Sequence, residues 1–318
     1  MHAPSAATRT STNARIDRRT TRTLLLRAWL TIRRLASGGF DDDASVDDYE
    51  LIDAGDGARL ERLGDHIVDR PHPAATGERR SPRRWADADL RFDRDGGWSG
   101  TGPERARNGW TTRIADLAFE LRPTTSGQVG VFPEHAALLP WLTEHVDAAT
   151  ERPSVLNLFA YTGMGTLALA RAGAAVTHVD AARPAVAWAR TNAALNELAD
   201  RPIRWLVDDA ADFVAREIRR ERRYDGVVLD PPTYGHGASG KAWRLEDDLE
   251  PLLDDIGRLL TPAGWVLLTA HAEGLDAGHL GAWLSTVVDD IEVGKLGLQA
   301  TSGASLALGF FARGSSAS

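Results

Sequence analysis

The chain has 318 residues, of which 43% are apolar and 26% charged, and its formal net charge is −8. No segment approaches the roughly 18 consecutive apolar residues that a membrane span needs. Cysteine is absent, which excludes a disulfide framework, a thiolate metal site and a cysteine nucleophile. This composition fits a reducing, cytoplasmic setting. The nine histidines form no HxxxH or HExxH pair, so we expect no metal site.

Residues 1–45 are predicted to be a basic, disordered extension. The first forty residues hold eight arginines against one acid, Asp17, a balance of +7 that leaves −15 on the rest of the chain. A transit-type presequence and a basic arm for nucleic acid are the alternatives. A chain that starts near Val46 should fold and bind its ligand normally, with a melting temperature within a few degrees of the full chain's.

Residues 46–125 are predicted to be a small β-rich domain. Short strand-like pieces separated by glycines make up the stretch "YELIDAGDGARLERLGDHIVDRP". A loop rich in proline and arginine follows, and then tryptophans recur at Trp85, Trp98 and Trp110. Large aromatic side chains are more often buried than exposed, so we expect these three to form core rather than a stacking platform for bases.

Residues 126–318 are predicted to form a doubly wound, mostly parallel α/β sheet of seven strands, Rossmann-like in its order. Apolar strands are expected at 154–159, 175–180, 203–207, 225–230 and 264–270, and helices near 134–146, 166–172, 184–198, 210–222 and 246–260. Such alternation is typical of a buried parallel sheet with right-handed crossovers. The stretches "EVGKLG" and "SLALGFFAR" are expected to close the sheet as a terminal strand pair.

The turn "NLFAYTGMGT", residues 157–166, is predicted to bind a nucleotide. Gly163 and Gly165 let the backbone approach a ligand closely. The dinucleotide pattern GxGxxG is not completed, because position 168 is alanine. Ligands of open α/β sheets lie beyond the carboxyl ends of the strands. Asp180 ends the second strand there and is placed for a ribose diol, with a turn or capping acid as the alternative.

Two further strand ends carry candidate ligand contacts. Asp209 ends the third strand, where an acid can accept a hydrogen bond from an exocyclic amine, and Phe213 could lie against an adenine ring. The alternatives are a helix-capping acid and a core aromatic. The fourth strand ends in "VVLDPPTYG", where the Asp230 carboxylate and freed carbonyls can accept N–H bonds from a planar amine or base. Tyr234 can then cover the ring face.

These motifs together resemble class I S-adenosylmethionine (SAM)-dependent methyltransferases. The resemblance is carried by "VLNLFAYTGMGTLALARAGAAVTHVD", "DDAADF" and "VVLDPPTYGHGASGKAWRLEDDL". It extends upstream to "YELIDAGDGARLERLGD" and "GQVGVFPEH", and so covers roughly 48–311. The subgroup it resembles is related to the bacterial 23S rRNA large-subunit methyltransferases I and K.

The resemblance implies SAM as the cofactor and a role for each matching position. The methionine part would be held by Phe159, Ala160, Tyr161, Thr162 and Gly163. Asp180 would bind the ribose hydroxyls, and Asp209 with Ala210 the adenine. Glu134 and His135 would approach the methionine end, or else simply begin a helix. Asp230 with Pro231 would face the methyl acceptor.

One departure from the family bears on the mechanism. Members that methylate C5 of cytosine use cysteines, one typically in a Thr-Cys-Ser setting, where this chain has Thr269, Ala270 and His271. Covalent attack on C6 needs a thiolate, so cytosine-C5 chemistry is excluded. Direct displacement by a nitrogen or another lone-pair nucleophile remains, with Asp230 orienting an amine. His271 is either the general base or a structural histidine.

The expected substrate is an RNA base, with rRNA favoured. The glycine-rich loop 233–244 carries Lys241, Trp243 and Arg244, which suits a nucleotide, although a solvated loop is the alternative. The stretch "ERRSPRRW" and the arginine-rich head also favour RNA, whereas the acidic balance of the remaining chain counts against it. A methyltransferase for a small molecule or a protein, and a non-catalytic SAM- or RNA-binding relative, are the alternatives. The sequence leaves the acceptor atom and the oligomeric state open.

Overall fold

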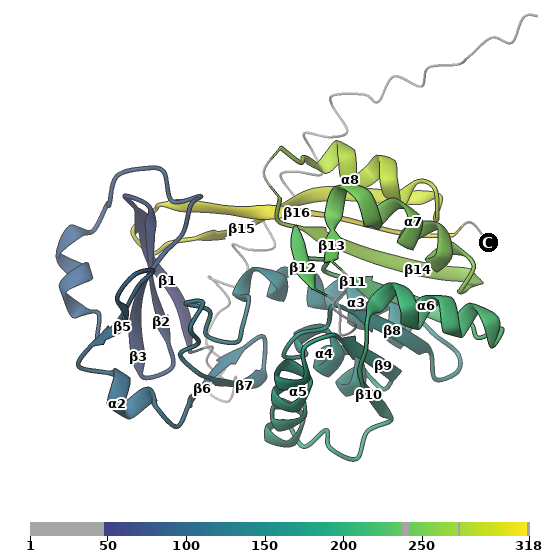
Figure 1. The fold of residues 1–318 in the computed structure, drawn as a ribbon, viewed down its shortest axis with the longest axis horizontal. Coiled ribbons are helices and arrows are strands. Elements are labelled where there is room, and N and C mark those ends of the chain that lie inside the picture. The colour runs from purple at the N-terminus through teal and green to yellow at the C-terminus, as the bar shows by residue number, and fades with distance from the viewer. Residues whose placement is uncertain (1–47, 237–241, 273, 317–318) are drawn as a thin grey trace, which may run out of the picture. The chain divides into compact units, whose positions relative to one another are not determined.

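The computed structural model describes residues 48–236, 242–272 and 274–316, which fall within one compact unit, 43–318 (Figure 1). The predicted extension over 1–45, the start near Val46 and the side chain of Lys241 lie outside the described residues. No helix in the described ranges has the length and apolar character to cross a membrane.

The first sheet of the described chain has five strands in the order β1-β2-β3-β4-β5. Its strands are β1 (Tyr49–Gly55), β2 (Ala58–Leu63), β3 (His66–Pro71), β4 (Leu90–Asp93) and β5 (Gly97–Gly100). The short helices η1 (Pro82–Asp87) and α2 (Pro103–Ala106) and the hairpin β6 (Trp110–Ile114) with β7 (Leu117–Leu121) accompany it. The β2–β3 turn requires Gly64, which has a φ of 59° and whose Cβ would lie 2.2 Å from the Thr111 carbonyl oxygen.

The three tryptophans of this region pack inward, as predicted. Trp85 is 4% exposed. Trp98 and Trp110 pack against the core, and their indole N–H groups donate to the carbonyls of Thr124 and Leu63 at 2.7 and 2.8 Å. Each indole thus buries its apolar ring while its polar N–H is satisfied, which is the usual state of a core tryptophan.

The second sheet has seven strands in the order β10-β9-β8-β11-β14-β16-β15. Its strands are β8 (Ser154–Leu158), β9 (Ala175–Asp180), β10 (Ile203–Val207), β11 (Tyr224–Leu229), β14 (Leu260–Ala270), β15 (Asp290–Gln299) and β16 (Ser305–Ser315). The first five are parallel; β16 is antiparallel to β14, and β15 is antiparallel to β16. The predicted doubly wound sheet is confirmed, including its terminal strand pair.

Helices cover both faces of this sheet (Figure 1). They are α3 (Leu139–Asp147), α4 (Met164–Ala172), α5 (Arg183–Leu195), α6 (Ala210–Arg219), α7 (Leu245–Gly257) and α8 (Ala277–Leu284), and η2 (Pro133–Leu138) precedes α3. Alternate residues of the buried strands point to opposite faces, so Val228 packs with α3 and α4 while Val227 and Leu229 pack with α6 and α7.

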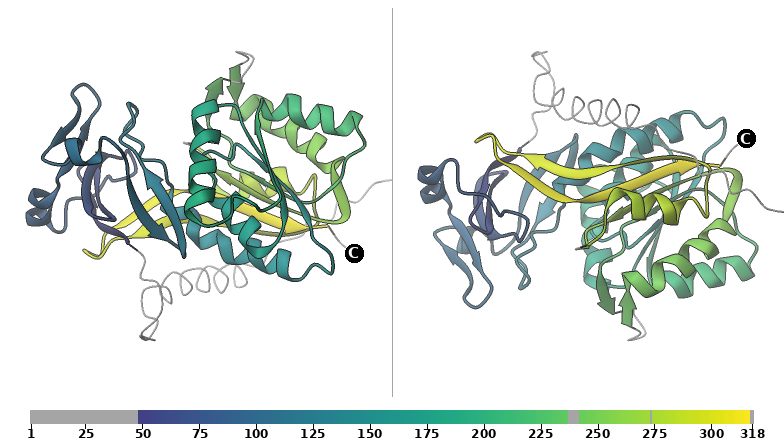
Figure 2. Two further views of the ribbon diagram at one scale, coloured as in Figure 1. Left: turned by 90° about the horizontal axis from the view of Figure 1, so that it is seen from below. Right: turned by 90° about the horizontal axis from the view of Figure 1, so that it is seen from above.

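The β15–β16 hairpin connects the two sheets, and its tip reaches β1 (Figure 2). The backbone N–H of Thr301 donates to Leu51 O at 2.9 Å, and that of Ser302 to Ile52 O at 3.1 Å. Asp53, fully buried, accepts bonds from the Ser302 hydroxyl, the Ser81 N–H and the Trp85 indole at 2.7, 2.8 and 2.9 Å. This buried carboxylate therefore ties three segments that lie far apart in the sequence.

Two elements differ from the sequence prediction. The loop expected over 233–244 contains a short antiparallel pair, β12 (Tyr234–His236) and β13 (Ala242–Arg244). Helix α8 was not expected, since its sequence holds two glycines within eight residues. Asp276 caps the start of α8: its side chain accepts a hydrogen bond from the His279 N–H, and the Asp276 N–H in turn donates to the His279 ring. This reciprocal cap compensates for the poor helix formers in the sequence.

Candidate active site

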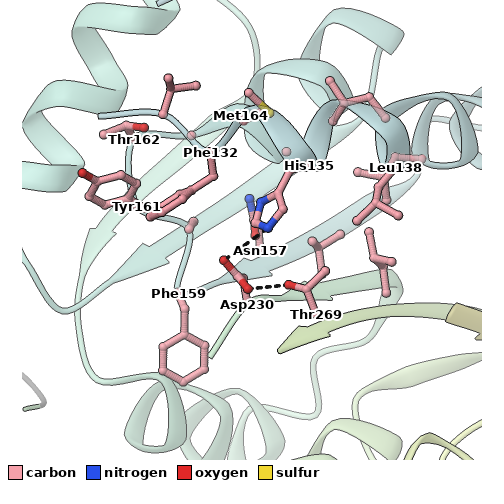
Figure 3. Close-up of a pocket in the computed structure, with 18 residues that line it drawn as sticks. Phe132, His135, Leu138, Asn157, Phe159, Tyr161, Thr162, Met164, Asp230 and Thr269 are labelled. Atoms are coloured by element: carbon pink, nitrogen blue, oxygen red, sulfur yellow. Dashed lines mark hydrogen bonds and ion pairs between the residues drawn. The ribbon is translucent and has the colours of Figure 1, made fainter. Parts of the chain in front are cut away.

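A cleft of about 600 Å³ opens at the carboxyl ends of β8, β11 and β14 (Figure 3). Its floor is the turn after β8, one wall is the segment leading into α3, and Asp230 and Thr269 close the far side. The cleft lies at the sheet edge where the ligands of open α/β sheets bind. The predicted nucleotide turn and the predicted acceptor residue therefore face one cavity.

The turn after β8 adopts an unusual backbone. Phe159 and Tyr161 have positive φ angles of 53° and 47°, and Gly163, which precedes α4, has 96°. Asp180 holds this conformation, because its carboxylate accepts from the backbone N–H of Tyr161 and of Ala182, both at 2.8 Å. Burial raises the pKa of Asp180, and these two bonds oppose the shift. Strained backbone of this kind is concentrated at functional sites.

A buried polar chain supports the turn from below. Asn157 donates to the Thr166 hydroxyl at 2.9 Å, and that hydroxyl lies 2.9 Å from Nδ1 of His178. Burial, with a smaller contribution from the Arg190 charge, lowers the pKa of His178 to about 3. His178 is therefore neutral, so its Nδ1 can accept a hydrogen bond from the Thr166 hydroxyl. This bond fixes the start of α4 against β8 and β9.

Glu134 is next in sequence to His135, which lines the cleft, and supplies an observation that bears on the cofactor. Its side chain is 4% exposed, and its Oε2 atom is buried without a hydrogen-bond partner. A buried, unpaired carboxylate oxygen is costly, and a cationic N–H donor would relieve that cost. The ammonium group of the methionine part of SAM is such a donor. The residues present therefore fit the cofactor that the fold implies.

The third-strand residues have different surroundings. Asp209 caps α6, accepting from the N–H groups of Ala211 and Asp212 at 3.0 and 3.1 Å, and it lines a second hollow together with Trp243. Ala210 is buried beside it. Phe213 is only 1% exposed and packs inside the core, so the prediction that its ring lies against adenine is wrong. Its position in the first turns of α6 directs it toward the sheet.

Asp230 is the centre of a polar cluster on the far side of the cleft, the side predicted to face the acceptor (Figure 3). Its Oδ1 accepts from the Thr269 hydroxyl at 2.5 Å and lies 3.2 Å from His271 Nε2, and its Oδ2 lies 3.7 Å from His135 Nε2. The two imidazoles are themselves 3.3 Å apart. His271 Nδ1 contacts the Leu308 carbonyl at 2.5 Å, which orients the ring. Three segments distant in sequence thus converge on one carboxylate.

Charges within this cluster shift its pKa values strongly. Burial would raise the pKa of Asp230, but the His135 charge and the hydrogen bonds and charge of His271 hold it well below its usual range. Burial would lower the pKa of His271, but the hydrogen bond and charge of Asp230, aided by the Leu308 carbonyl, raise it to about 9. At neutral pH the two therefore form an ion pair.

His135, Asp230 and His271 are also the residues, within the described ranges, whose donor atoms could hold a metal ion. One atom from each lies within 4.8 Å of the others. The expectation of no metal site relied on local spacing, and a set assembled from three distant segments escapes any spacing motif. Here the three groups pair with one another by hydrogen bonding and charge.

The aromatic residues near Asp230 divide into one exposed and one buried ring. Tyr234 is 55% exposed on β12. Trp243 is 8% exposed, donates to the Pro232 carbonyl at 2.7 Å and packs on Phe159 at 4.9 Å between ring centroids. Pro231 is buried and Arg244 exposed. Of the aromatic residues expected in a cap over the acceptor, Tyr234 is thus the exposed one, whereas Trp243 anchors the β12–β13 pair.

Comparison with known proteins agrees with this geometry. Residues 86–279 match the family model described as S-adenosylmethionine-dependent methyltransferase. A crystal structure of the SAM-dependent methyltransferase from Agrobacterium tumefaciens is 35% identical, with a TM-score of 0.79, over 85% of this chain and 91% of that one. The chain therefore belongs to the SAM-dependent methyltransferase family, and SAM is its cofactor.

Relatives with named substrates match over shorter parts of their length. Ribosomal RNA large subunit methyltransferase K/L of Methylococcus capsulatus is 36% identical over 118 residues, 36% of this chain and 16% of that protein. The protein of the same name from Shewanella strain MR-4 is 28% identical over 70% of this chain and 34% of its own length. The structure of SMU.776 complexed with SAH, 14% identical with a TM-score of 0.67, shares the fold.

Proposed function

We propose that this enzyme methylates a base of ribosomal RNA by direct displacement, without a covalent enzyme–base adduct. The observation that carries the proposal is the position of Asp230, which lines the same cleft as the turn after β8, where we propose that SAM binds. The names of the curated relatives support an RNA base as the acceptor, and the exposed Tyr234, four residues after Asp230, fits it.

Each residue of the cluster has a role in this proposal. SAM, when bound, supplies a methyl group already activated on a sulfonium, so the protein has mainly to position the acceptor and exclude water. Asp230, with the carbonyl of Pro231, orients an amine of the base through its N–H groups. Thr269 and His271 fix the Asp230 carboxylate, and His271 in its neutral form accepts the proton that the amine releases.

The basic stretch 78–84 contributes less to this proposal than its composition suggests. Arg79 and Arg84 lie near Asp56 and Asp87 at 3.5 and 3.1 Å. Arg80 donates to the Gly303 carbonyl at 2.9 Å. These three arginines are already paired with groups of the protein itself. The proposal of an RNA substrate therefore depends on the cleft and on the relatives.

The methyl-transfer rate should depend on pH through His271. Because its pKa is raised to about 9, only about one molecule in a hundred has a neutral His271 at pH 7, and the rate should rise with pH until about 9. His271→Gln should be slower and should lose this rise. Single-turnover transfer from pH 6.5 to 9.5 at saturating SAM measures both profiles. A wild-type rate that is flat between pH 7 and 9 would remove His271 from the proton transfer.

Removing divalent metal ions should leave the rate unchanged. The sulfonium needs no Lewis acid, and the Asp230 charge is balanced by His271. Enzyme dialysed against EDTA should therefore match untreated enzyme within about twofold in single-turnover transfer, a margin far below the effect of losing a catalytic metal. Loss of activity that one divalent ion restores would instead assign His135, Asp230 and His271 to a metal site.

The substrate class is tested by tritium transfer. Labelled SAM and the purified enzyme are incubated with RNA, protein and metabolite fractions from a deletion strain, in which the target is unmethylated. Label should enter the large-subunit rRNA, with Asp230→Ala enzyme as the control for background incorporation. Label confined to protein or metabolites would reject RNA as the substrate while leaving the methyltransferase activity in place.

A further inference from the structure

Two buried arginines lie side by side on the inner face of the first sheet. Arg59 on β2 and Arg70 on β3 are direct cross-strand partners, which places both side chains on one face. They are 3% and 2% exposed. Like charges in this position destabilise a sheet, and burying a guanidinium without full pairing is costly. The fold therefore maintains a charge arrangement that its own stability does not favour.

One carboxylate serves both cations. Oε2 of the buried Glu61 lies 3.2 Å from Arg59 Nε and 2.8 Å from Arg70 Nε, while its Oε1 accepts from the Tyr49 hydroxyl at 3.0 Å. Although burial opposes it, the two arginines lower the pKa of Glu61 to about 2. Glu61 is thus ionised and fully engaged, and the group of three retains one positive charge.

Three N–H donor atoms of this pair remain unused. Arg70 Nη1 donates to the Gly127 carbonyl and the Gln128 side chain at 3.3 and 3.1 Å, but Arg70 Nη2 is buried without a partner. Arg59 Nε, although within ion-pair distance of Glu61, makes no aligned hydrogen bond, and Arg59 Nη1 has no partner either. Guanidinium donors in a fixed fork match the oxygens of a carboxylate or a phosphate.

The segment that Arg70 contacts leads directly into the cleft wall. Three residues after Gly127, the Gly130 carbonyl accepts from the Thr162 hydroxyl at 2.6 Å, and the Phe132 ring lies 5.5 Å from that of Tyr161. The Arg70 charge acts on the Tyr161 hydroxyl. Burial and then the charges of Arg59 and Arg70 lower the pKa of His72 to about 4, and His271 contributes to the same shift. The Arg70 charge is therefore within electrostatic reach of Tyr161, which lines the cleft.

We propose that Arg59 and Arg70 form an anion-binding site for a carboxylate or phosphate group of a ligand held in the adjoining cleft. This proposal rests on the proposed function, which assigns the cleft as the place where SAM and the acceptor bind. Two sources have this chemistry: the carboxylate of the methionine part of SAM, and an anionic group of the acceptor, such as a phosphate of RNA. The unused donors of the two buried guanidinium groups are the feature that an oxyanion would satisfy.

Arg59→Gln tests the site, with Arg62→Gln as the matched control. Arg62 is on the same strand but on its other face, where it pairs with Glu50. The substitution in either variant removes one charge, and Arg59→Gln leaves the Arg70–Glu61 pair intact. Circular dichroism and melting temperature establish that each variant is folded. If Arg59→Gln fails to fold, Arg59→Lys replaces it, since a lysine keeps the charge but loses the fork.

Two measurements distinguish the sources. In calorimetry, a SAM carboxylate in the site predicts that Arg59→Gln weakens SAM at least tenfold and leaves decarboxylated SAM unchanged. With saturating SAH, an acceptor anion predicts that inorganic phosphate raises the melting temperature of wild type and Arg62→Gln but not of Arg59→Gln. If Arg59→Gln and Arg62→Gln have the same SAM affinity and the same phosphate-induced shift in melting temperature, the anion site is overturned. Neither measurement needs the acceptor, so a failure to label RNA would reject the proposed function alone.

Discussion

Replacing Asp230 by alanine should lower the single-turnover methyl-transfer rate about 100-fold or more, the scale of a lost positioning or proton-transfer contact. The Asp230 carboxylate contacts Thr269, His135 and His271, and none of these three belongs to the turn after β8. SAM affinity should therefore stay within a few-fold of wild type. The rate is measured at saturating SAM, with large-subunit rRNA from a deletion strain as the acceptor.

The exposed Asp254 provides a control for the loss of one negative charge. Asp254→Ala should keep the wild-type rate, since its carboxylate lies on α7, away from the cleft. Asp230→Ala at the wild-type rate would show that the acceptor lies elsewhere. An enzyme–RNA adduct that resists denaturation would contradict the direct-displacement mechanism itself.

Replacing Asp180 by alanine should weaken SAM binding by about 1.5–3 kcal/mol, the scale of a hydrogen bond to a charged group. The carboxylate contributes twice: we expect it to bind the ribose diol, and it holds Tyr161 in its positive-φ conformation through the Tyr161 N–H. Calorimetry of the folded variant measures the change. Because the turn loses a constraint, the melting temperature should fall as well.

An acid outside the cleft separates these effects from a general loss of charge. Asp212 is exposed in the first turn of α6, and Asp212→Ala should leave SAM affinity unchanged. A variant Asp180→Ala with unchanged affinity and a lowered melting temperature would limit Asp180 to shaping the turn. A loss of affinity larger than the loss of stability would support direct contact with the ribose.

The large sheet could be predicted because its signals are local. Each buried strand is a short apolar run, and each following helix has its own spacing of apolar residues, so the alternation alone indicates the fold. The same argument failed for α8 because its stability comes from the Asp276–His279 cap and from packing rather than from its residues' helix propensity. The β12–β13 pair was missed because three-residue strands leave no periodic pattern.

The candidate site was predictable residue by residue but not as an arrangement. Asp180 and Asp230 follow predicted strands, so their place at the sheet edge follows from topology. The contact between His135 and His271 spans 136 residues, and no spacing rule brings them together. Phe213 was misplaced because a sequence shows that an aromatic follows a strand end but not which side of the helix meets the core.

The position of β16 in the sheet determines when, during synthesis of the chain, the contacts of His271 can form. This strand lies between β14 and β15, and its residue Leu308 provides the carbonyl that orients His271. Residue 308 must therefore have left the ribosome before His271 acquires its partner, however early the turn after β8 forms. Because Leu308 follows His271 by 37 residues, a newly made chain should form the turn after β8 before it completes the contacts of His271.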